Sequence, residues 1–170
     1  MEQNVSMKIN ELPSPTWNWL KVNETPIKWS NKIEPCEIAA EGDAVATETE
    51  QLSDIETGAG READAIFATE NTAKYQILAD NAGQDKTVRL HISGKKDAHT
   101  AGCVEIVAKE NSTLTVVMDS RVAPDATKEE DSTAEASLAV RVRMKVESGA
   151  SVRLVQVQMP QEHELSLIHI

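Results

Sequence analysis

The residues of this sequence best suited to chemistry are its cysteines and two of its histidines. His91 and His99 flank a Ser93-Gly94 turn, and Cys103 follows His99 by four residues, so the three side chains would meet if the loop folded back on the strand. Metal ligands must converge at about 2.0–2.3 Å from one ion, and nothing in this spacing enforces that convergence. We therefore interpret these residues as structural, with Cys103 acting as a small buried hydrophobe in a strand.

The second cysteine, Cys36, lies between Pro35 and Glu37, where we expect it to be exposed. Its nearest basic neighbour is Lys32, so nothing close in sequence would lower its pKa, and we predict a poor nucleophile. The two cysteines are 67 residues apart, without the close pairing of a zinc site or of a disulfide-rich secreted domain. This usage predicts a cytoplasmic protein.

A glycine-rich segment, Gly58-Ala59-Gly60-Arg61-Glu62-Ala63, matches the permissive dinucleotide fingerprint, and Asp80 lies twenty residues past Gly60. That loop binds a nucleotide only when a buried strand precedes it and a helix follows it. The preceding sequence TETEQLSDIET is polar nearly throughout. We therefore interpret the match as coincidental.

Acidic residues are abundant, but the densest run, Glu129-Glu130-Asp131, falls in a segment typical of a solvated loop. Exposed carboxylates keep ordinary pKa values and are poor general acids, so we interpret this run as solubilising charge. No nucleophile elbow, phosphate-binding loop or His-Glu-x-x-His helix occurs. The sequence predicts no catalytic residue, no cofactor-binding residue, no metal ligand and no cofactor.

The overall charge excludes one large class of partner. The chain has 28 acidic and 17 basic residues, a formal net charge of −11, whereas nucleic-acid affinity comes largely from Lys and Arg. No secretory signal and no apolar run of the ~20 residues needed to span a bilayer is present, so neither nucleic acid nor membrane is expected as a partner.

The elements that would position these residues are β-strands. From Tyr75 onward, β-branched residues alternate with polar ones, which is typical of strands with one buried face. The predicted strands are 87–92, 103–108, 113–119, 136–146 and 150–158. An acidic loop at 125–135 separates the third strand from the fourth, so we expect a mainly β fold.

The sequence before Tyr75 predicts two different segments. Residues 1–35 hold Trp17, Trp19 and Trp29 within a proline-rich stretch, which indicates a mostly irregular or partly helical anchoring arm that packs through its aromatic rings. Residues 36–74 are rich in Ala, Glu, Thr and Asp, with apolar residues too sparse for a buried strand. We predict an acidic linker with short helical turns there.

A weak internal repeat links the later strands. Aligning residues 107–119 with 145–157, an offset of 38, pairs Leu114 with Val152 and Val116 with Leu154. Such a strand–turn–strand unit cannot bury its apolar face alone, so its copies must stack on one another, as in a β-helix or other solenoid. A β-sandwich also fits strands of this spacing.

Four stretches together resemble one family. They are LPSPTWNWLKVN (12–23), TGAGREAD (57–64), YQILAD (75–80), and the paired strands at 104–119 and 142–158. In order and spacing they resemble the SufB/SufD family of iron–sulfur cluster assembly proteins, specifically its SufD-like members. Two departures are Ala59, where the family has an apolar residue in the glycine segment, and Met118-Asp119, where an acid often ends the first strand pair.

The resemblance implies a right-handed parallel β-helix at residues 75–160. It also implies a scaffold subunit without its own turnover, in a cytosolic complex with a SufB-like paralogue and a SufC-like ABC-type ATPase; pairing with a second copy is the other option. The family's ATPase-docking helices and its proposed Cys and His positions lie near the C-terminal end of the full-length protein. No functional residue is therefore carried over to this chain.

The last residues, LSLIHI at 165–170, back-translate to the mosaic end of a sequencing transposon, so we expect a non-native adapter tail on an N-terminal fragment with an incomplete β-helix. A carbohydrate-active or carbohydrate-binding β-helix protein is the alternative function. Sugar platforms generally need exposed rings, and Tyr75 is the sole aromatic from residue 75 on, which disfavours this alternative.

Overall fold

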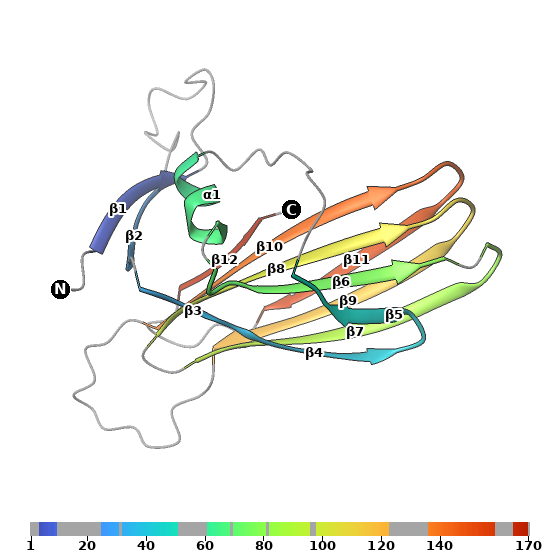
Figure 1. The fold of residues 1–170 in the computed structure, drawn as a ribbon, viewed down its shortest axis with the longest axis horizontal. Coiled ribbons are helices and arrows are strands. Elements are labelled where there is room, and N and C mark those ends of the chain that lie inside the picture. The colour runs from blue at the N-terminus through green and yellow to red at the C-terminus, as the bar shows by residue number, and fades with distance from the viewer. Residues whose placement is uncertain are drawn as a thin grey trace.

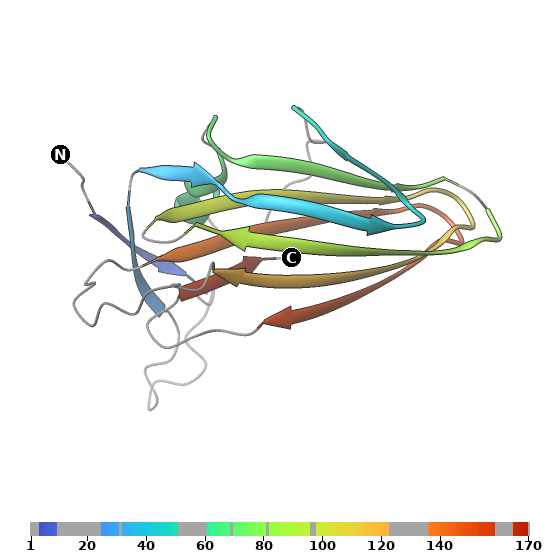
Figure 2. The ribbon, with the colours of Figure 1, turned by 90° about the horizontal axis from the view of Figure 1, so that it is seen from below.

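The protein is described here from a computed structural model that covers residues 4–9, 25–30, 32–50, 61–68, 70–80, 82–95, 98–122, 136–158 and 165–169. These residues build an elongated, mainly β molecule of curled mixed sheets, as the sequence predicted. Figures 1 and 2 show two long layers of strands that run side by side, with tight turns at one end and the β1–β2 pair and a short helix at the other.

Six long strands form the body of the two layers. Five of them, β7 to β11, overlap the five predicted strands, because apolar residues recur at alternate positions and give each strand a buried face. Their bounds are β6 Ala73–Ala79, β7 Asp85–Gly94, β8 His99–Ala108, β9 Thr113–Val122, β10 Ser137–Val146 and β11 Ser151–Gln158.

Successive strand–turn–strand units stack in parallel; we call each unit a coil. The coils are β6–β7, β8–β9 and β10–β11. In the six-stranded sheet β6, β8 and β10 pair in parallel, and in the four-stranded sheet β7, β9 and β11 do the same. His99 lies opposite Ser137 and Thr113 opposite Ser151, so the last two coils repeat at an offset of 38 residues in both sheets. The first coil is closer in sequence to the second: Ala73 lies opposite Gly102 and Asp85 opposite Thr113.

The register confirms the internal repeat found in the sequence. Val152 lies opposite Leu114 and Leu154 opposite Val116, the same residues that the alignment paired. The two sheets face each other as in a sandwich, but a typical β-sandwich pairs its strands antiparallel. Parallel pairing between coils is the arrangement that the stacking argument requires.

The main hydrophobic core lies between the two sheets. Val104 and Ile106 of β8 face Leu114, Val116 and other residues of the opposite sheet, and all are fully buried. The neighbouring residues on each strand point away from this core because side chains alternate across a strand. Each sheet therefore has an inner apolar face and an outer face with polar residues.

Tight turns join the strands of each coil and lie next to one another. Asn111 and Gly149 both have positive φ, 57° and 69°, the left-handed conformation that Asn and Gly tolerate best. The Asn111 amide donates a hydrogen bond to the Ser148 carbonyl at 3.1 Å, and the Gly83 amide donates one to the Asn111 carbonyl at 3.0 Å. These hydrogen bonds between turns connect all three coils at this end.

The N-terminal arm differs from its prediction. Its described residues are strands, where we expected a mostly irregular or partly helical arm: β1 Asn4–Ile9 pairs antiparallel with β2 Thr25–Ser30, and β3 Ile33–Pro35 pairs in parallel with β8. The prediction was wrong because it took the prolines as evidence against strands. Pro26 lies near the start of β2 and Pro35 is the last residue of β3, and a strand tolerates proline at both positions. Trp17 and Trp19 lie outside the described residues.

The predicted linker at 36–74 also contains unexpected strands. β4 Glu37–Gly42 pairs antiparallel with β7, and β5 Val45–Glu48 pairs antiparallel with β6. Ile38 and Ala40 of β4 and Ala46 of β5 are only partly buried against the core. Edge strands such as these need fewer apolar residues than a central strand does, so the sparse apolar residues did not prevent strand formation. The single helix described in this segment, α1 Arg61–Phe67, fits the expected helical turns.

Two further segments complete the comparison. β12 Leu165–His169, in the suspected adapter tail, pairs in parallel with the first half of β10. The acidic loop at 125–135 and residues 129–131 within it lie outside the described residues. Among the described helices, none has the length and apolar character needed to cross a membrane.

Candidate functional site

The cysteine at position 36 marks the point where the chain leaves the six-stranded sheet. Its amide donates a hydrogen bond to the Ala101 carbonyl at 3.1 Å, after which β4 joins the other sheet. The prediction that Cys36 is exposed is wrong, because the side chain is 5% exposed and belongs to the main core. A chain that crosses from one sheet to the other passes over the edge of the core. The Cys36 thiol lies at this crossing and packs into the core, which explains its burial.

Cys103 lies close by on the other side of β8. Gly102 faces the main core, where a Cβ on it would lie 2.4 Å from the Cys36 sulfur, so the next residue, Cys103, faces outward. Cys103 is nevertheless 1% exposed and packs with Ile66 and Phe67 of α1, which confirms that it is buried in a strand. Both thiols are free, and they lie on opposite faces of β8.

Burial controls the protonation of both thiols. It raises the pKa of Cys36 to about 12, with the nearby Cys103 thiol adding to the rise. Burial also raises the pKa of Cys103, but there the guanidinium of Arg141 opposes the effect. In the folded chain both thiols are therefore protonated at neutral pH. They differ in that Cys103 has the Arg141 guanidinium beside it.

The two histidines do not join Cys103 in a site. His91, on β7 in the four-stranded sheet, has its Nδ1 3.5 Å from Oδ2 of Asp119. His99, on β8 in the six-stranded sheet, has its Nδ1 2.5 Å from the Ser137 hydroxyl oxygen. No group of three potential metal ligands gathers among the residues that the structure describes.

The richest polar arrangement lies on the outer face of the six-stranded sheet. Lys74 and Arg141 are the register partners of Cys103 on its two sides, so a thiol stands between two cations in one row across the sheet. In the next row Gln76 Nε2 donates a hydrogen bond of 2.9 Å to Oε2 of Glu105, a carboxylate with no exposed surface. We call these two rows the outer polar ladder.

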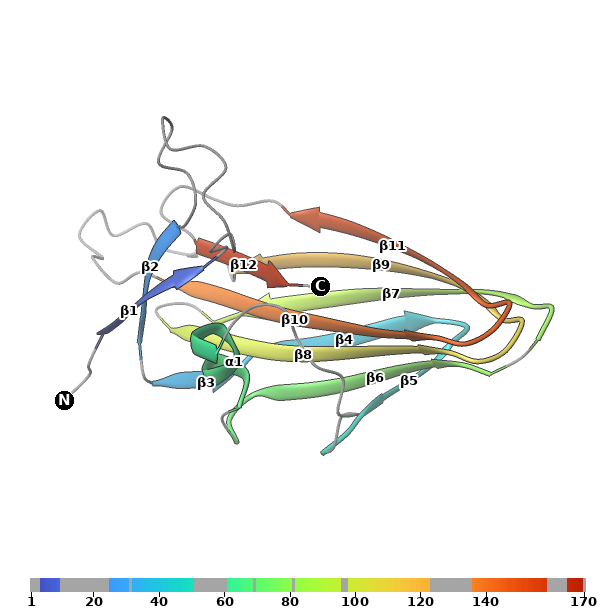
Figure 3. The same cartoon turned by 90° about the horizontal axis from the view of Figure 1, so that it is seen from above.

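Helix α1 covers the first row of this ladder (Figure 3). Arg141 is the link: its Nη1 lies 3.3 Å from Oδ1 of Asp64, and its guanidinium carbon lies 4.9 Å from the centre of the Phe67 ring. Alternation along β8 and β10 indicates which of their side chains face outward. No signal in the sequence indicates that a helix much earlier in the chain packs over them, so sequence analysis missed this site.

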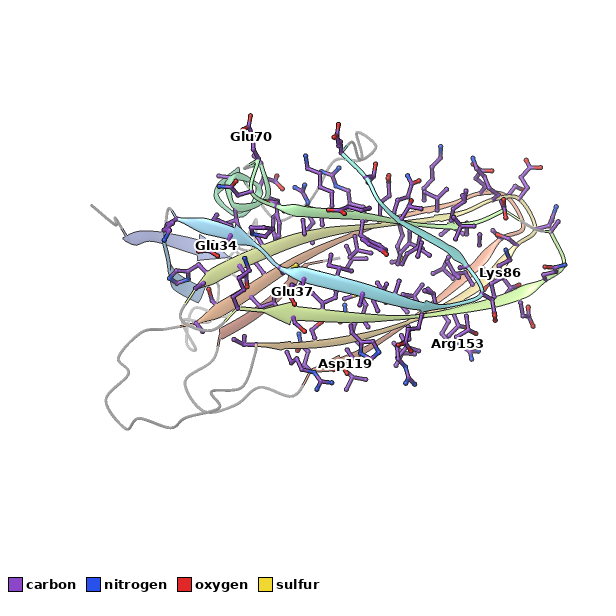
Figure 4. All side chains as sticks on the ribbon, turned by 60° about the horizontal axis from the view of Figure 1, so that its bottom comes forward. Glu34, Glu37, Glu70, Lys86, Asp119 and Arg153 are labelled. Atoms are coloured by element: carbon purple, nitrogen blue, oxygen red, sulfur yellow. The ribbon has the colours of Figure 1, made fainter. Side chains whose placement is uncertain are left out.

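Two grooves lie beside the ladder. One, of about 340 Å³, is bordered by Glu105, Val107 and Lys145. The other, of about 520 Å³, lies at the β3–β4 edge and is bordered by several acids, among them Glu37 and Glu70. Figure 4 shows Glu37 beside β4 and Glu70 beyond α1, whereas Asp119 lies on the opposite side of the molecule. Cys36 borders the second groove beside these carboxylates, but burial raises its pKa to about 12, so the thiol is protonated there at neutral pH.

The last coil leaves an open apolar edge. Among the described strands, β11 has a neighbour on one side only, and β12 covers only the first half of β10. Four large apolar side chains are exposed on these two strands, among polar and charged ones: Met144, Val146, Val155 and Val157. We call these four residues the open edge; unpaired strand edges with apolar side chains are sites for pairing with another chain.

The glycines of the remaining motif, the dinucleotide-like segment at 58–63, cannot be placed. Gly58 and Gly60 lie outside the described residues, and α1 begins at Arg61 and has seven residues. The strand that precedes the segment, β5, is an antiparallel edge strand with Val45 exposed, not the buried parallel strand that the fingerprint requires.

Compared with known proteins, the chain matches no family model, no curated protein and no solved structure.

Proposed function

We propose that the chain is a SufD-like scaffold subunit of a cytosolic iron–sulfur cluster assembly complex, acting with a SufB-like paralogue and a SufC-like ABC-type ATPase. In this proposal the subunit has no catalytic turnover of its own. Its contribution is a rigid surface on which partners assemble. The two free, buried cysteines fit a reducing compartment, where disulfides rarely form.

The observation that supports this proposal is the parallel stacking of coils in both sheets, in which the last two coils keep the same offset of 38 residues. His99 pairs with Ser137 and Thr113 with Ser151, so two consecutive coils superimpose along their whole length. We propose that this stack is a right-handed parallel β-helix, the fold that the family resemblance implies, since crossovers between parallel strands are overwhelmingly right-handed. Stacked coils give the long flat edges that a scaffold offers to its partners.

The open edge is the surface that we assign to the SufB-like paralogue. Its unpaired backbone N–H and C=O groups on β11 can extend the four-stranded sheet into another chain, with main-chain hydrogen bonds giving affinity. Val155 and Val157 are 41% and 39% exposed, and contact with a partner would remove this apolar surface from water. At the opposite end of the two sheets the edge strands are β4 and β5, which pair antiparallel with β7 and β6.

The experiment is co-purification of the tagged chain with a co-expressed SufB-like paralogue. Replacing Val155 and Val157 together with lysine places two charges on the edge, and we expect at least about tenfold weaker capture of the paralogue. Val45→Lys is the matched control, because Val45 is an exposed valine, 49% exposed, on the strand β5 at the other edge. This control variant should capture the paralogue as well as the unmodified chain does.

Two outcomes would contradict the proposal. Equal capture by the double-lysine variant and by Val45→Lys would show that the open edge is not the docking surface. Binding of the chain to a glycan array, with no capture of a SufB-like paralogue, would favour the carbohydrate-binding alternative.

A further inference from the structure

Cys103 lies in a cationic environment. Lys74 of β6 and Arg141 of β10 are its register partners, and Arg143 stands one row further along β10. The Arg141 guanidinium is close enough to Cys103 to oppose the rise in its pKa that burial causes. Arg141 therefore has two contacts of different kinds: it pairs with Asp64 and lies over the Phe67 ring of α1, and it also places a cation beside the buried thiol.

Arg141 itself is incompletely satisfied. It is 8% exposed, and its Nε has no hydrogen-bond partner among the described residues, although Nη1 pairs with Asp64. A buried guanidinium N–H without a partner loses its solvation without compensation. The same group lies beside the Cys103 sulfur, so a negative charge that formed on the sulfur would have a donor already in place.

Helix α1 controls access to this thiol. It has seven residues, too few to be stable alone, because isolated helices shorter than ~12–15 residues are marginal in water. It is held over Cys103 by the buried side chains of Ile66 and Phe67 and by the Asp64–Arg141 ion pair. All these contacts are on the outer face of the sheet, so α1 can lift away while the main core stays packed.

We propose that Cys103 is a modification site under a removable cover: when α1 lifts, the thiol is S-thiolated by an anionic low-molecular-weight disulfide. The Cys103 thiol gives its proton to solvent, and the thiolate attacks one sulfur of the disulfide. A new S–S bond forms to Cys103, the disulfide's own S–S bond breaks, and its second half leaves as a thiolate. The disulfide is the only oxidant that the step needs.

The surrounding charges explain both the gating and the choice of reagent. With α1 in place, burial keeps the pKa of Cys103 raised. When α1 lifts, burial is lost, while Lys74, Arg141 and Arg143 remain to favour the thiolate and to attract an anionic reagent. The acids that face the thiol are Asp64, which leaves with α1, and Glu105, which hydrogen-bonds to Gln76. This inference is independent of the proposed function.

The test measures thiolation by oxidised glutathione under native conditions, by mass spectrometry of the whole chain. In a Cys36→Ala background, Phe67→Ala should speed modification of Cys103 about 30-fold or more, because Phe67 is a buried contact of α1. Asp64→Asn, which removes only the ion pair to Arg141, should speed it several-fold. No acceleration in either variant would overturn the proposal.

Cys36 provides the matched control within the same chain. It is also buried, at 5% exposed against 1% for Cys103, but it packs in the main core and not under α1. In a Cys103→Ala background, Phe67→Ala should leave the modification rate of Cys36 within about twofold of its starting value. If Phe67→Ala instead exposed both thiols alike, the chain would be unfolding as a whole, and a cover specific to Cys103 would be excluded.

A second arm tests the cations. With α1 released by Phe67→Ala, the thiolation rate of Cys103 should reach half its maximum below pH ~8.5, the ordinary pKa of a cysteine. Adding Arg141→Gln should move that midpoint upward and slow oxidised glutathione by more than it slows the neutral reagent iodoacetamide. A midpoint at or above the ordinary value, or equal slowing of both reagents, would contradict a cation-activated site.

Discussion

Gly42→Ala is expected to lower the free energy of unfolding by about 2–4 kcal/mol, although it adds only one methyl group. Gly42 ends β4 with a φ of 141°, a conformation that residues with a side chain rarely adopt. A Cβ at this position would lie 2.2 Å from the Thr87 carbonyl oxygen and 2.8 Å from the Val88 Cα. Both atoms are backbone of β7, so β4 must separate from β7 to make room.

The matched control for this prediction is Gly83→Ala. Gly83 also has a positive φ, 77°, but a Cβ there would have no atom within 4 Å. In this variant the free energy of unfolding should fall only by the cost of placing a side chain in the left-handed conformation, about 1 kcal/mol. Urea denaturation followed by circular dichroism gives both values. Equal losses in the two variants would show that β4 does not pack against β7 as described.

Gly102→Ala is expected to lower the free energy of unfolding by about 2–3 kcal/mol, and Cys36→Ala is expected to remove most of that loss. The new Cβ would lie 2.4 Å from the Cys36 sulfur, which is buried and has little room to move. Without that sulfur the next neighbour is Ile38 Cδ1 at 3.4 Å, an ordinary contact distance. The methyl group added at 102 then fills the space that the sulfur leaves.

A double-mutant cycle measures this relationship. Cys36→Ala alone should cost about 1 kcal/mol for the small cavity, and Gly102→Ala in that background should cost less than about 1 kcal/mol. The coupling free energy between the two sites should therefore be about 2 kcal/mol, measured from four urea unfolding curves. Additive losses would place the Cys36 thiol away from Gly102, as the exposed position predicted from the sequence would require.

The sequence predicted the later strands well because their physical signal is local. Val116, Met118 and their neighbours alternate with polar residues, and alternation fixes both the strand and its buried face. The repeat also predicted the register between β9 and β11, since the apolar residues of one coil must lie next to those of the following coil to be excluded from water. The N-terminal strands were missed because β4 and β5 are edge strands, which need few apolar residues.

The candidate site was harder to predict because it depends on contacts between distant segments. Asp64 and Arg141 are 77 residues apart, and neither belongs to a recognisable motif. The burial of Cys36 likewise depends on where β3 crosses between the sheets, a feature of topology that Pro35 and Glu37 do not encode. Sequence patterns give the face of a strand, whereas the element that covers that face is fixed by the tertiary structure.

The measurement that tests the account most directly is disulfide formation between cysteines introduced on β9 and β11, in a background without Cys36 and Cys103. Register partners in a parallel sheet lie about 4.8 Å apart, within the Cα separation that a disulfide spans. Three double variants probe outward-facing partners at the same 38-residue offset: Thr113→Cys with Ser151→Cys, Thr115→Cys with Arg153→Cys, and Val117→Cys with Val155→Cys.

Stacked parallel coils predict that all three pairs form an intramolecular disulfide under mild oxidation, as mass spectrometry of the digested chain would show. Antiparallel strands would bring together at most one of the three, because moving forward along one strand then means moving backward along the other. Disulfides in all three variants would support the coil stack on which the scaffold proposal rests; a disulfide in only one variant would contradict it.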